Sequence, residues 1–216
     1  MCPAETPAGA PPRGSAQAAE RTHREILAAT IGVIAEHSLS GTTIERVATV
    51  AGIAAGTVIL HFKRKEALLV AALEHIAGEF DAARRAAIAA SGGDAAVALA
   101  RLIDLYLDPA LASVPKIAVW TAYWGEAGAR RVYMDRVSQV DSDALADLTR
   151  LFAALIAGGG YRHLDAEANA KAFAGLLEYF WQDILAVGEG FDRDRARATG
   201  RRFLAGLFPA EFTQLG

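Results

Sequence analysis

The stretch TTIERVATVAGIAAGTVILHFKRKEALL, residues 42–69, decides the fold predicted for this chain. It predicts a short helix over residues 43–50, a tight turn at Gly52 and a second short helix over residues 54–61. Gly52 suits the turn because glycine readily adopts the positive φ that often follows a helix end. A basic step then leads into a long helix. Two short helices joined in this way form a helix-turn-helix, which can place its second helix in the major groove of DNA.

The composition predicts an all-α protein in a reducing, cytoplasmic compartment. Hydrophobic residues make up 53% of the 216 residues, and helix-forming types dominate. The net charge is −3 at pH 7, with +1 over residues 1–70 and −4 over the remainder, so a DNA-binding surface must be local. The one cysteine, Cys2, allows no intrachain disulfide. The chain has no signal-peptide core and no uncharged apolar run of about 18 residues, so no membrane partner is expected.

The flanking sequence predicts a disordered tail and about nine helices in all. Residues 1–20 are rich in alanine, proline and glycine and have little to bury, which favours disorder. A first helix is predicted over residues 21–37, and Thr42 or Thr43 would cap the helix that follows. The later helices are predicted over residues 65–90, 95–112, 115–128, 130–157, 165–187 and 192–208, with Pro209 ending the ordered region.

Residues 42–69 resemble the DNA-binding segment of TetR-family transcriptional regulators. The matching features are the Thr42-Thr43 start, the spacing of Ala48, Ala51 and Gly52, the pair Gly56-Thr57, the aromatic Phe62, and Lys65-Glu66 followed by Leu68-Leu69. The resemblance implies a helix-turn-helix DNA-binding domain over residues 21–68 and a helical ligand-binding and dimerisation domain over residues 69–210. It also implies a double-stranded DNA operator and a small-molecule effector as partners.

The resemblance assigns DNA contacts to the second short helix and to its flanks. The predicted contacts are Thr43, Ala55, Thr57, Ile59, Leu60, His61, Lys63 and Lys65. The chain departs from the family pattern at Ala54, which replaces a capping serine, at Arg64, and at the apolar Ile59 and Leu60. Thymine methyl groups are the contacts that such apolar side chains can make in the major groove. The alternative is that Ile59 and Leu60 pack in the protein core or are simply tolerated on the surface.

Aromatic residues gather in the later helices and predict a ligand pocket. Trp120 and Trp124 share a helix face at i, i+4. Aromatic rings around a cavity attract quaternary ammonium ions, and Glu178, Asp183, Glu126 or Asp104 could balance the charge. The predicted ligand contacts are Tyr106, Trp120, Tyr123, Trp124, Glu178 and Trp181, and Tyr133 adds a further ring. The alternative is that these rings only fill the core and a dimer interface.

The C-terminal part carries a second resemblance. Residues 116–145, KIAVWTAYWGEAGARRVYMDRVSQVDSDAL, and residues 175–185, GLLEYFWQDIL, resemble the C-terminal region of BetI-type regulators. In that subfamily the effector is choline, which makes choline one candidate ligand. The helix predicted over residues 165–187 is apolar on two adjacent faces, and the resemblance implies that residues 165–208 pair with a second copy in a homodimer.

The sequence favours a regulator over an enzyme. It contains no nucleophile elbow, phosphate-binding glycine loop or metal-spaced histidine cluster, so we expect no catalytic residues, no metal and no cofactor. The expected function is a repressor that binds a palindromic operator as a homodimer and is released by an effector. The alternative is a dimeric all-α protein that binds small molecules without specific DNA binding.

Overall fold

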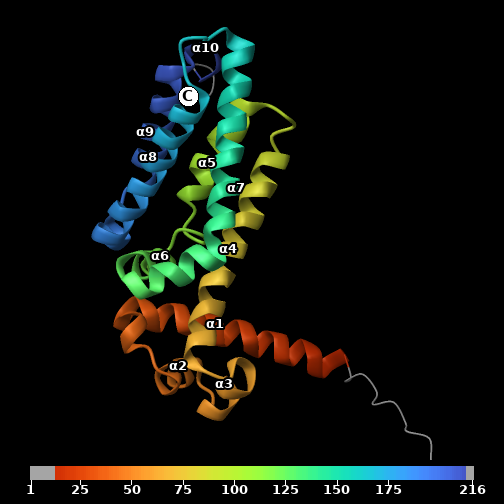
Figure 1. Cartoon of the computed structure of the whole chain (residues 1–216), viewed down its shortest axis with the longest axis vertical. Helices are drawn as coiled ribbons and strands as arrows, with labels where there is room; N and C mark the ends of the chain where they lie inside the picture. Colours follow the sequence, from red (N-terminus) through yellow and green to blue (C-terminus); the bar gives the residue numbers. More distant parts are fainter. Residues whose placement is uncertain (1–12, 213–216) are drawn as a thin grey trace, which may run out of the picture.

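The computed structural model describes residues 13–212, which fold into helices and connecting turns (Figure 1). This confirms the predicted all-α class. The elements are α1 (Arg13–Gly41), α2 (Ile44–Ala51), α3 (Ala55–Phe62), α4 (Lys65–Ala89), α5 (Ala95–Tyr106), α6 (Val114–Gly125), α7 (Ala127–Gly159), α8 (Ala166–Val187), the 3-10 turn η1 (Gly188–Gly190), α9 (Arg193–Leu207) and α10 (Pro209–Phe212).

The helix-turn-helix forms as its local signals predict. The Thr43 hydroxyl accepts a hydrogen bond from the Arg46 backbone N–H at 3.2 Å and so caps α2. The Thr42 hydroxyl is buried and donates to the Ser38 carbonyl at 2.7 Å. Gly52 has φ of 67°, the left-handed conformation expected at the turn. Ala54 precedes α3 without a side-chain cap, in keeping with the missing serine.

The predicted disordered tail is wrong for residues 13–20, because α1 begins at Arg13. The prolines that favoured disorder all precede this point, and residues 16–20, AQAAE, consist of alanine, glutamine and glutamate, which are good helix formers. Residues 1–12 lie outside the described part of the chain. The predicted break after residue 37 appears as a kink at Ser38, where φ is 63°.

Several helix boundaries after α4 differ from the prediction, and α6 ends at Gly125 instead of residue 128. Helix α5 ends at Tyr106 instead of residue 112, because Pro109 cannot donate the next helical hydrogen bond and the Asp108 carboxylate binds the Ala110 N–H at 2.8 Å. Helix α7 is longer than predicted at both ends. Pro209 starts α10 instead of ending the fold, since its fixed φ suits the first turn of a helix.

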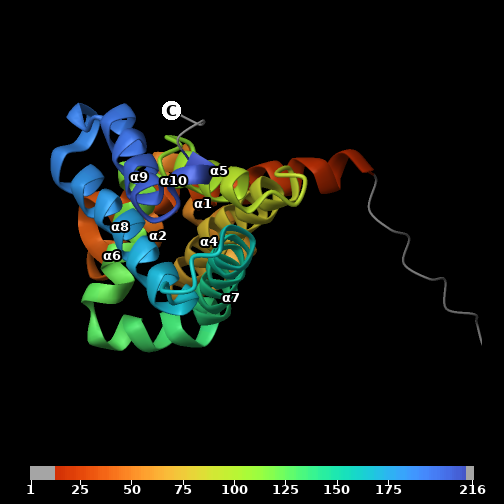
Figure 2. The ribbon, with the colours of Figure 1, turned by 90° about the horizontal axis from the view of Figure 1, so that it is seen from above.

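The helices α1–α3, which we call the head, and the helices from α5 onward, which we call the body, share a packed junction, and α4 connects the two. Helices α1, α2 and α3 form the lower part of the molecule in Figure 1, α4 rises from them, and α8 and α9 lie side by side on the outside of the body, as Figure 2 also shows. The buried core of the head includes Leu73 of α4, Val119 and Tyr123 of α6, and Tyr133 of α7. Helix α6 therefore lies between α1–α3 and the rest of the body.

No single helix within residues 13–212 is long and apolar enough to cross a membrane. Helices α2 and α3 taken together reach the length and apolar composition of a membrane span, but the two helices meet at a bend of 112°.

Candidate functional site

The second helix of the helix-turn-helix presents an apolar outer face. Val58 and Phe62 point into the head core, where they are 0% and 7% exposed. Ile59 and Leu60 are instead 47% and 69% exposed. The alternative that these two side chains pack in the core is therefore wrong. Val50, at the end of α2, adds a third exposed apolar side chain.

The other DNA contacts predicted on α3 are less exposed to solvent. Ala55 and the polar residues Thr57 and His61 are half-buried. The His61 ring lies 5.9 Å from the ring of His23 on α1, and the His23 ring stacks on Phe62 at 4.7 Å between ring centroids. His61 thus faces the junction of α3 with α1, with part of its ring open to solvent.

The basic step between α3 and α4 bends sharply. Lys63 ends α3 with φ of 65°, which is uncommon for a residue other than glycine. Its ammonium group donates to the Leu60 carbonyl at 3.1 Å. The Lys65 ammonium donates to the Ser40 carbonyl at 2.9 Å and ties the start of α4 to the end of α1. Both hydrogen bonds are exposed to solvent, beside the outer face of α3.

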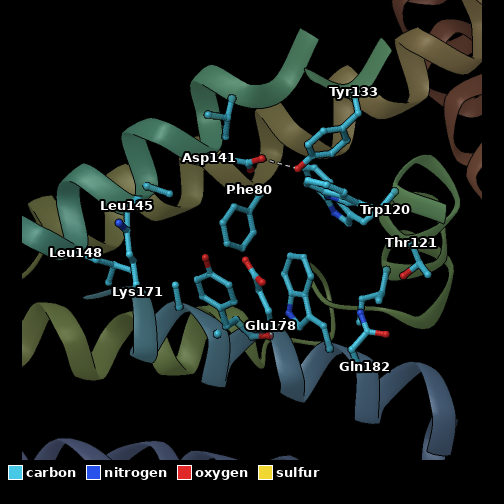
Figure 3. Close-up of a pocket in the computed structure, with 18 residues that line it drawn as sticks. Phe80, Trp120, Thr121, Tyr133, Asp141, Leu145, Leu148, Lys171, Glu178 and Gln182 are labelled. Carbon is cyan, nitrogen blue, oxygen red and sulfur yellow. Dashed lines mark hydrogen bonds between the residues drawn. The ribbon is translucent and has the colours of Figure 1, made fainter. Parts of the chain in front are cut away.

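A cavity of about 670 Å³ lies in the body, between helices α4, α5, α6, α7 and α8 (Figure 3). We call it the aromatic cavity. Its walls are formed by Phe80, Tyr106, Ile117, Trp120, Thr121, Trp124, Tyr133, Val140, Asp141, Ala144, Leu145, Leu148, Lys171, Ala174, Gly175, Glu178, Trp181 and Gln182.

Five of the six predicted ligand contacts line this cavity, and Tyr123 does not. Trp120 and Trp124 line it from one face of α6. Tyr123 lies on the face of α6 that packs on the head, together with Val119, and is 3% exposed. The two pairs are each spaced at i, i+4, and one residue of helix separates the pairs by about 100° around the helix axis.

Six aromatic rings form a continuous chain along the cavity. Phe80, Tyr106 and Trp181 pack together with centroids 4.8–5.5 Å apart. Trp181 is held in place because its indole N–H donates to the Tyr106 carbonyl at 2.8 Å. Trp120 lies 6.2 Å from Trp181 and 5.7 Å from Tyr133, and Trp124 lies 5.1 Å from Tyr133; each distance is between ring centroids.

Two carboxylates face the same space, Asp141 from α7 and Glu178 from α8 (Figure 3). The Tyr133 hydroxyl donates to Asp141 at 2.6 Å. Desolvation raises the pKa of both carboxyl groups, and the nearby Asp141 charge raises the pKa of Glu178 further. A pair of carboxylates in partly desolvated surroundings is an environment that a bound cation would stabilise.

The other charged groups near the cavity are already paired or lie elsewhere. The Lys171 ammonium is 2.6 Å from the Glu167 carboxylate. Asp104, one of the acidic candidates in the sequence, binds Arg201 at 3.0 Å and does not line the cavity. The described cavity walls therefore carry an excess of negative charge.

Sequence reasoning missed Phe80 and Asp141 as wall residues. Phe80 is an apolar residue in the middle of α4, and nothing in its spacing distinguishes it from the core. Asp141 follows Tyr133 by eight residues, about two helical turns, and both lie in the helix predicted over residues 130–157, so a pairing between the two side chains could have been found from the sequence.

The all-α fold, the exposed face of α3 and the aromatic cavity define a class of protein: a helix-turn-helix regulator with a ligand cavity in its helical body. Comparison with known families supports this class. The family described as BetI-type transcriptional repressor, C-terminal, matches residues 95–209, more than half of the chain, and the tetR family of bacterial regulatory proteins matches residues 26–72. The chain belongs to the TetR family of transcriptional regulators and has a BetI-type C-terminal domain.

Individual relatives extend over most of the chain. The HTH-type transcriptional regulator BetI of Ectopseudomonas mendocina is 26% identical over 187 residues, which cover 83% of this chain and 90% of the relative. BetI of Escherichia coli K12 is also 26% identical, over 192 residues that cover 87% of this chain and 94% of the relative.

Solved structures share the fold. The fatty acid degradation regulator FadR of Bacillus halodurans aligns with a TM-score of 0.72 at 21% identity and covers 86% of this chain and 95% of its own. A TetR transcription regulator of Haloarcula marismortui aligns with a TM-score of 0.69 at 20% identity, with coverages of 88% and 98%.

The protein is thus a ligand-responsive, DNA-binding transcriptional regulator of the repressor type. The alternative of a small-molecule-binding protein without specific DNA binding is not favoured. Regulators of this family bind DNA operators and small-molecule effectors, typically as dimers.

Proposed function

We propose that this regulator binds a palindromic operator as a homodimer and is released when an organic cation of the quaternary ammonium type, such as choline, enters the aromatic cavity. The observation that carries the proposal is the meeting of Asp141 and Glu178 with six aromatic rings around one space. Aromatic rings attract a quaternary ammonium ion through their electron-rich faces. The carboxylates supply the opposite charge, which rings alone do not.

Helix α6 offers a route from the cavity to the DNA-binding head. One face of α6 carries Trp120 and Trp124 on the cavity wall, and the neighbouring face carries Val119 and Tyr123 in the core of the head. A ligand that displaces the two tryptophans would shift α6 as a rigid body. Because α6 packs against α1, the head would shift with it.

Helix α4 offers a second route. Phe80 lines the cavity, and one turn later the nearly fully buried Arg84 binds Asp81 at 2.6 Å and forms an ion pair with Asp147 of α7. A change in the spacing of α4 and α7 would break this buried ion pair, which costs several kcal/mol. The pair therefore favours a small number of discrete α4 positions, which suits a switch between two states.

The homodimer is proposed to form through α8 and α9. Tyr179 on α8 is 61% exposed and Val187, at the end of the same helix, is 57% exposed. Leu204 and Phe208 are fully buried in the core of their own protomer, so they are not available to a partner. Helix α8 would thus supply most of the apolar contact, with α9 beside it.

The DNA contacts proposed are those of the sequence analysis, led by Ile59 and Leu60 on α3 and by Lys63 and Lys65 at the basic step. Thr43, Ala55, Thr57 and His61 complete the set. Two weak heads on one symmetric operator add their binding free energies, which favours a dimer on a palindrome. A ligand that prefers the wrong spacing of the two heads lowers operator affinity by its differential binding to the two states.

The test starts from DNA fragments that the protein selects from a random library. The selected operator, labelled with a fluorophore, is titrated with the protein, and the complex is then titrated with choline and with tetramethylammonium. We expect a site-specific complex that dissociates as the cation is added. Stable binding of the operator at saturating cation would contradict the proposal that a cation is the effector.

A further inference from the structure

We infer that the effector is a cation with an apolar tail: an ammonium head group held at Asp141 and Glu178, and a neutral hydrocarbon chain that runs toward Leu145 and Leu148. The inference rests on the proposed function, because it assigns a chemical class to the ligand of the same cavity. It goes beyond that function because choline has no such tail.

The volume of the cavity is the first argument. A water molecule occupies about 30 Å³ in the liquid, so a small cation with about seven non-hydrogen atoms needs roughly 200 Å³. The cavity provides about 670 Å³, within the range of sites that bind drug-sized ligands. A choline-sized ligand would leave about two thirds of the space to water, against walls that are largely aromatic and aliphatic.

The distribution of side chains along the cavity is the second argument. In Figure 3, Leu145 and Leu148 lie at one end, Thr121 and Gln182 lie at the other, and Asp141 and Glu178 lie between the two ends. Three small residues also line the cavity: Ala144 precedes Leu145 on α7, and Ala174 and Gly175 follow Lys171 by about one turn of α8. This end offers apolar surface without a carboxylate among its described residues.

The charge at the apolar end is the third argument. Lys171 lies at that end of the cavity and is held by Glu167 in an ion pair at 2.6 Å (Figure 3). A second cationic group on the ligand would meet an ammonium there and no free carboxylate. A ligand with one charge and a neutral tail therefore suits both the carboxylates and the apolar end, whereas a long dication suits only the carboxylates.

A series of alkyltrimethylammonium ions tests the inference on the full-length protein. The chain length is increased from methyl to decyl, below the micelle concentration, and affinity is measured by quenching of tryptophan fluorescence or by calorimetry. Burying each added methylene should raise the affinity about fourfold until the chain reaches the end of the cavity. A bis(trimethylammonium) alkane of matched length should bind more weakly than the monocation.

Two variants separate a tail site from general hydrophobic binding. Ala174→Leu reduces the space beside the leucines and should remove most of the chain-length gain, measured relative to the tetramethylammonium affinity of the same variant. Ala144→Leu, on the facing helix, provides a second test if the first variant has an altered thermal melt. Both variants leave the two carboxylates unchanged.

The possible results are distinct. Affinity that rises with chain length in the native protein but not in the filled variants supports the inference. Tetramethylammonium binding with no dependence on chain length overturns the tail and leaves the cationic effector standing. If none of the ammonium ions binds, both the tail inference and the cationic effector of the proposed function are wrong. A chain-length gain that survives in both variants also overturns the inference, since the tail would then lie elsewhere.

Discussion

The exposed apolar face of α3 predicts that this protein reads thymine methyl groups. Leu60 and Ile59 are 69% and 47% exposed, and the helix lacks the arginine, lysine, asparagine and glutamine side chains that make paired hydrogen bonds to bases. Replacing one contacted thymine per half-site with deoxyuridine removes a methyl group and leaves the hydrogen-bonding edge intact. Each lost methyl contact should cost about 0.8 kcal/mol. A dimer on two half-sites should therefore lose about 1.6 kcal/mol, or roughly 15-fold in affinity.

The assay is fluorescence anisotropy at one fixed salt concentration, because phosphate contacts make affinity strongly salt-dependent. The same operators are measured with Leu60→Ala and Ile59→Ala. If Leu60 contacts the methyl, the deoxyuridine penalty should largely disappear in Leu60→Ala, which is the signature of coupling in a double-mutant cycle. The slope of affinity against salt should not change, since no charge is removed. Equal binding of thymine and uracil operators by the native protein, or an unchanged penalty in both variants, would refute the reasoning.

Four further predictions concern DNA charge contacts, ligand binding, its pH dependence and assembly. Lys65→Ala should lower the slope of log affinity against log salt by about 0.9 per half-site, as a salt titration would show; an unchanged slope removes Lys65 from the phosphate contacts. Trp120→Ala should weaken cation-induced release by roughly 2- to 30-fold, from about 0.5–2 kcal/mol of cation–π attraction, while operator affinity without ligand stays constant. Cation affinity should fall as pH drops through the raised pKa values of Asp141 and Glu178, because the ligand favours their ionised forms, and should level off at higher pH; a flat profile in calorimetry would contradict this. Tyr179→Asp should yield monomers in sedimentation experiments and weaken operator binding, whereas an intact dimer would exclude this face of α8.

Local signals account for the parts of the fold that the sequence predicted well. The Thr43 cap and the Gly52 turn act within a few residues, so the helix-turn-helix was readable without knowledge of the remaining chain. The predicted boundaries are wrong at two prolines, because proline ends one helix and begins another. Pro109 shortens α5, and Pro209 starts a helix although it was expected to end the ordered region.

The cavity was predictable only in part. The i, i+4 spacing of Trp120 and Trp124 identified one wall, since both residues lie on the same helix. Asp141 and Phe80 reach the cavity from α7 and α4, and no sequence pattern states how those helices pack on α6. Tyr123 illustrates the converse: it is an aromatic neighbour of Trp124 in sequence, but its face of α6 packs on the head.

The central claim is that cation binding in the body and operator binding by the head are coupled. The most direct test is the dissociation constant of tetramethylammonium, measured for the free protein and for the protein saturated with its selected operator. Coupling is reciprocal, so the cation should bind the operator complex more weakly by the same factor by which saturating cation weakens operator binding. The same dissociation constant in both states would contradict the claim.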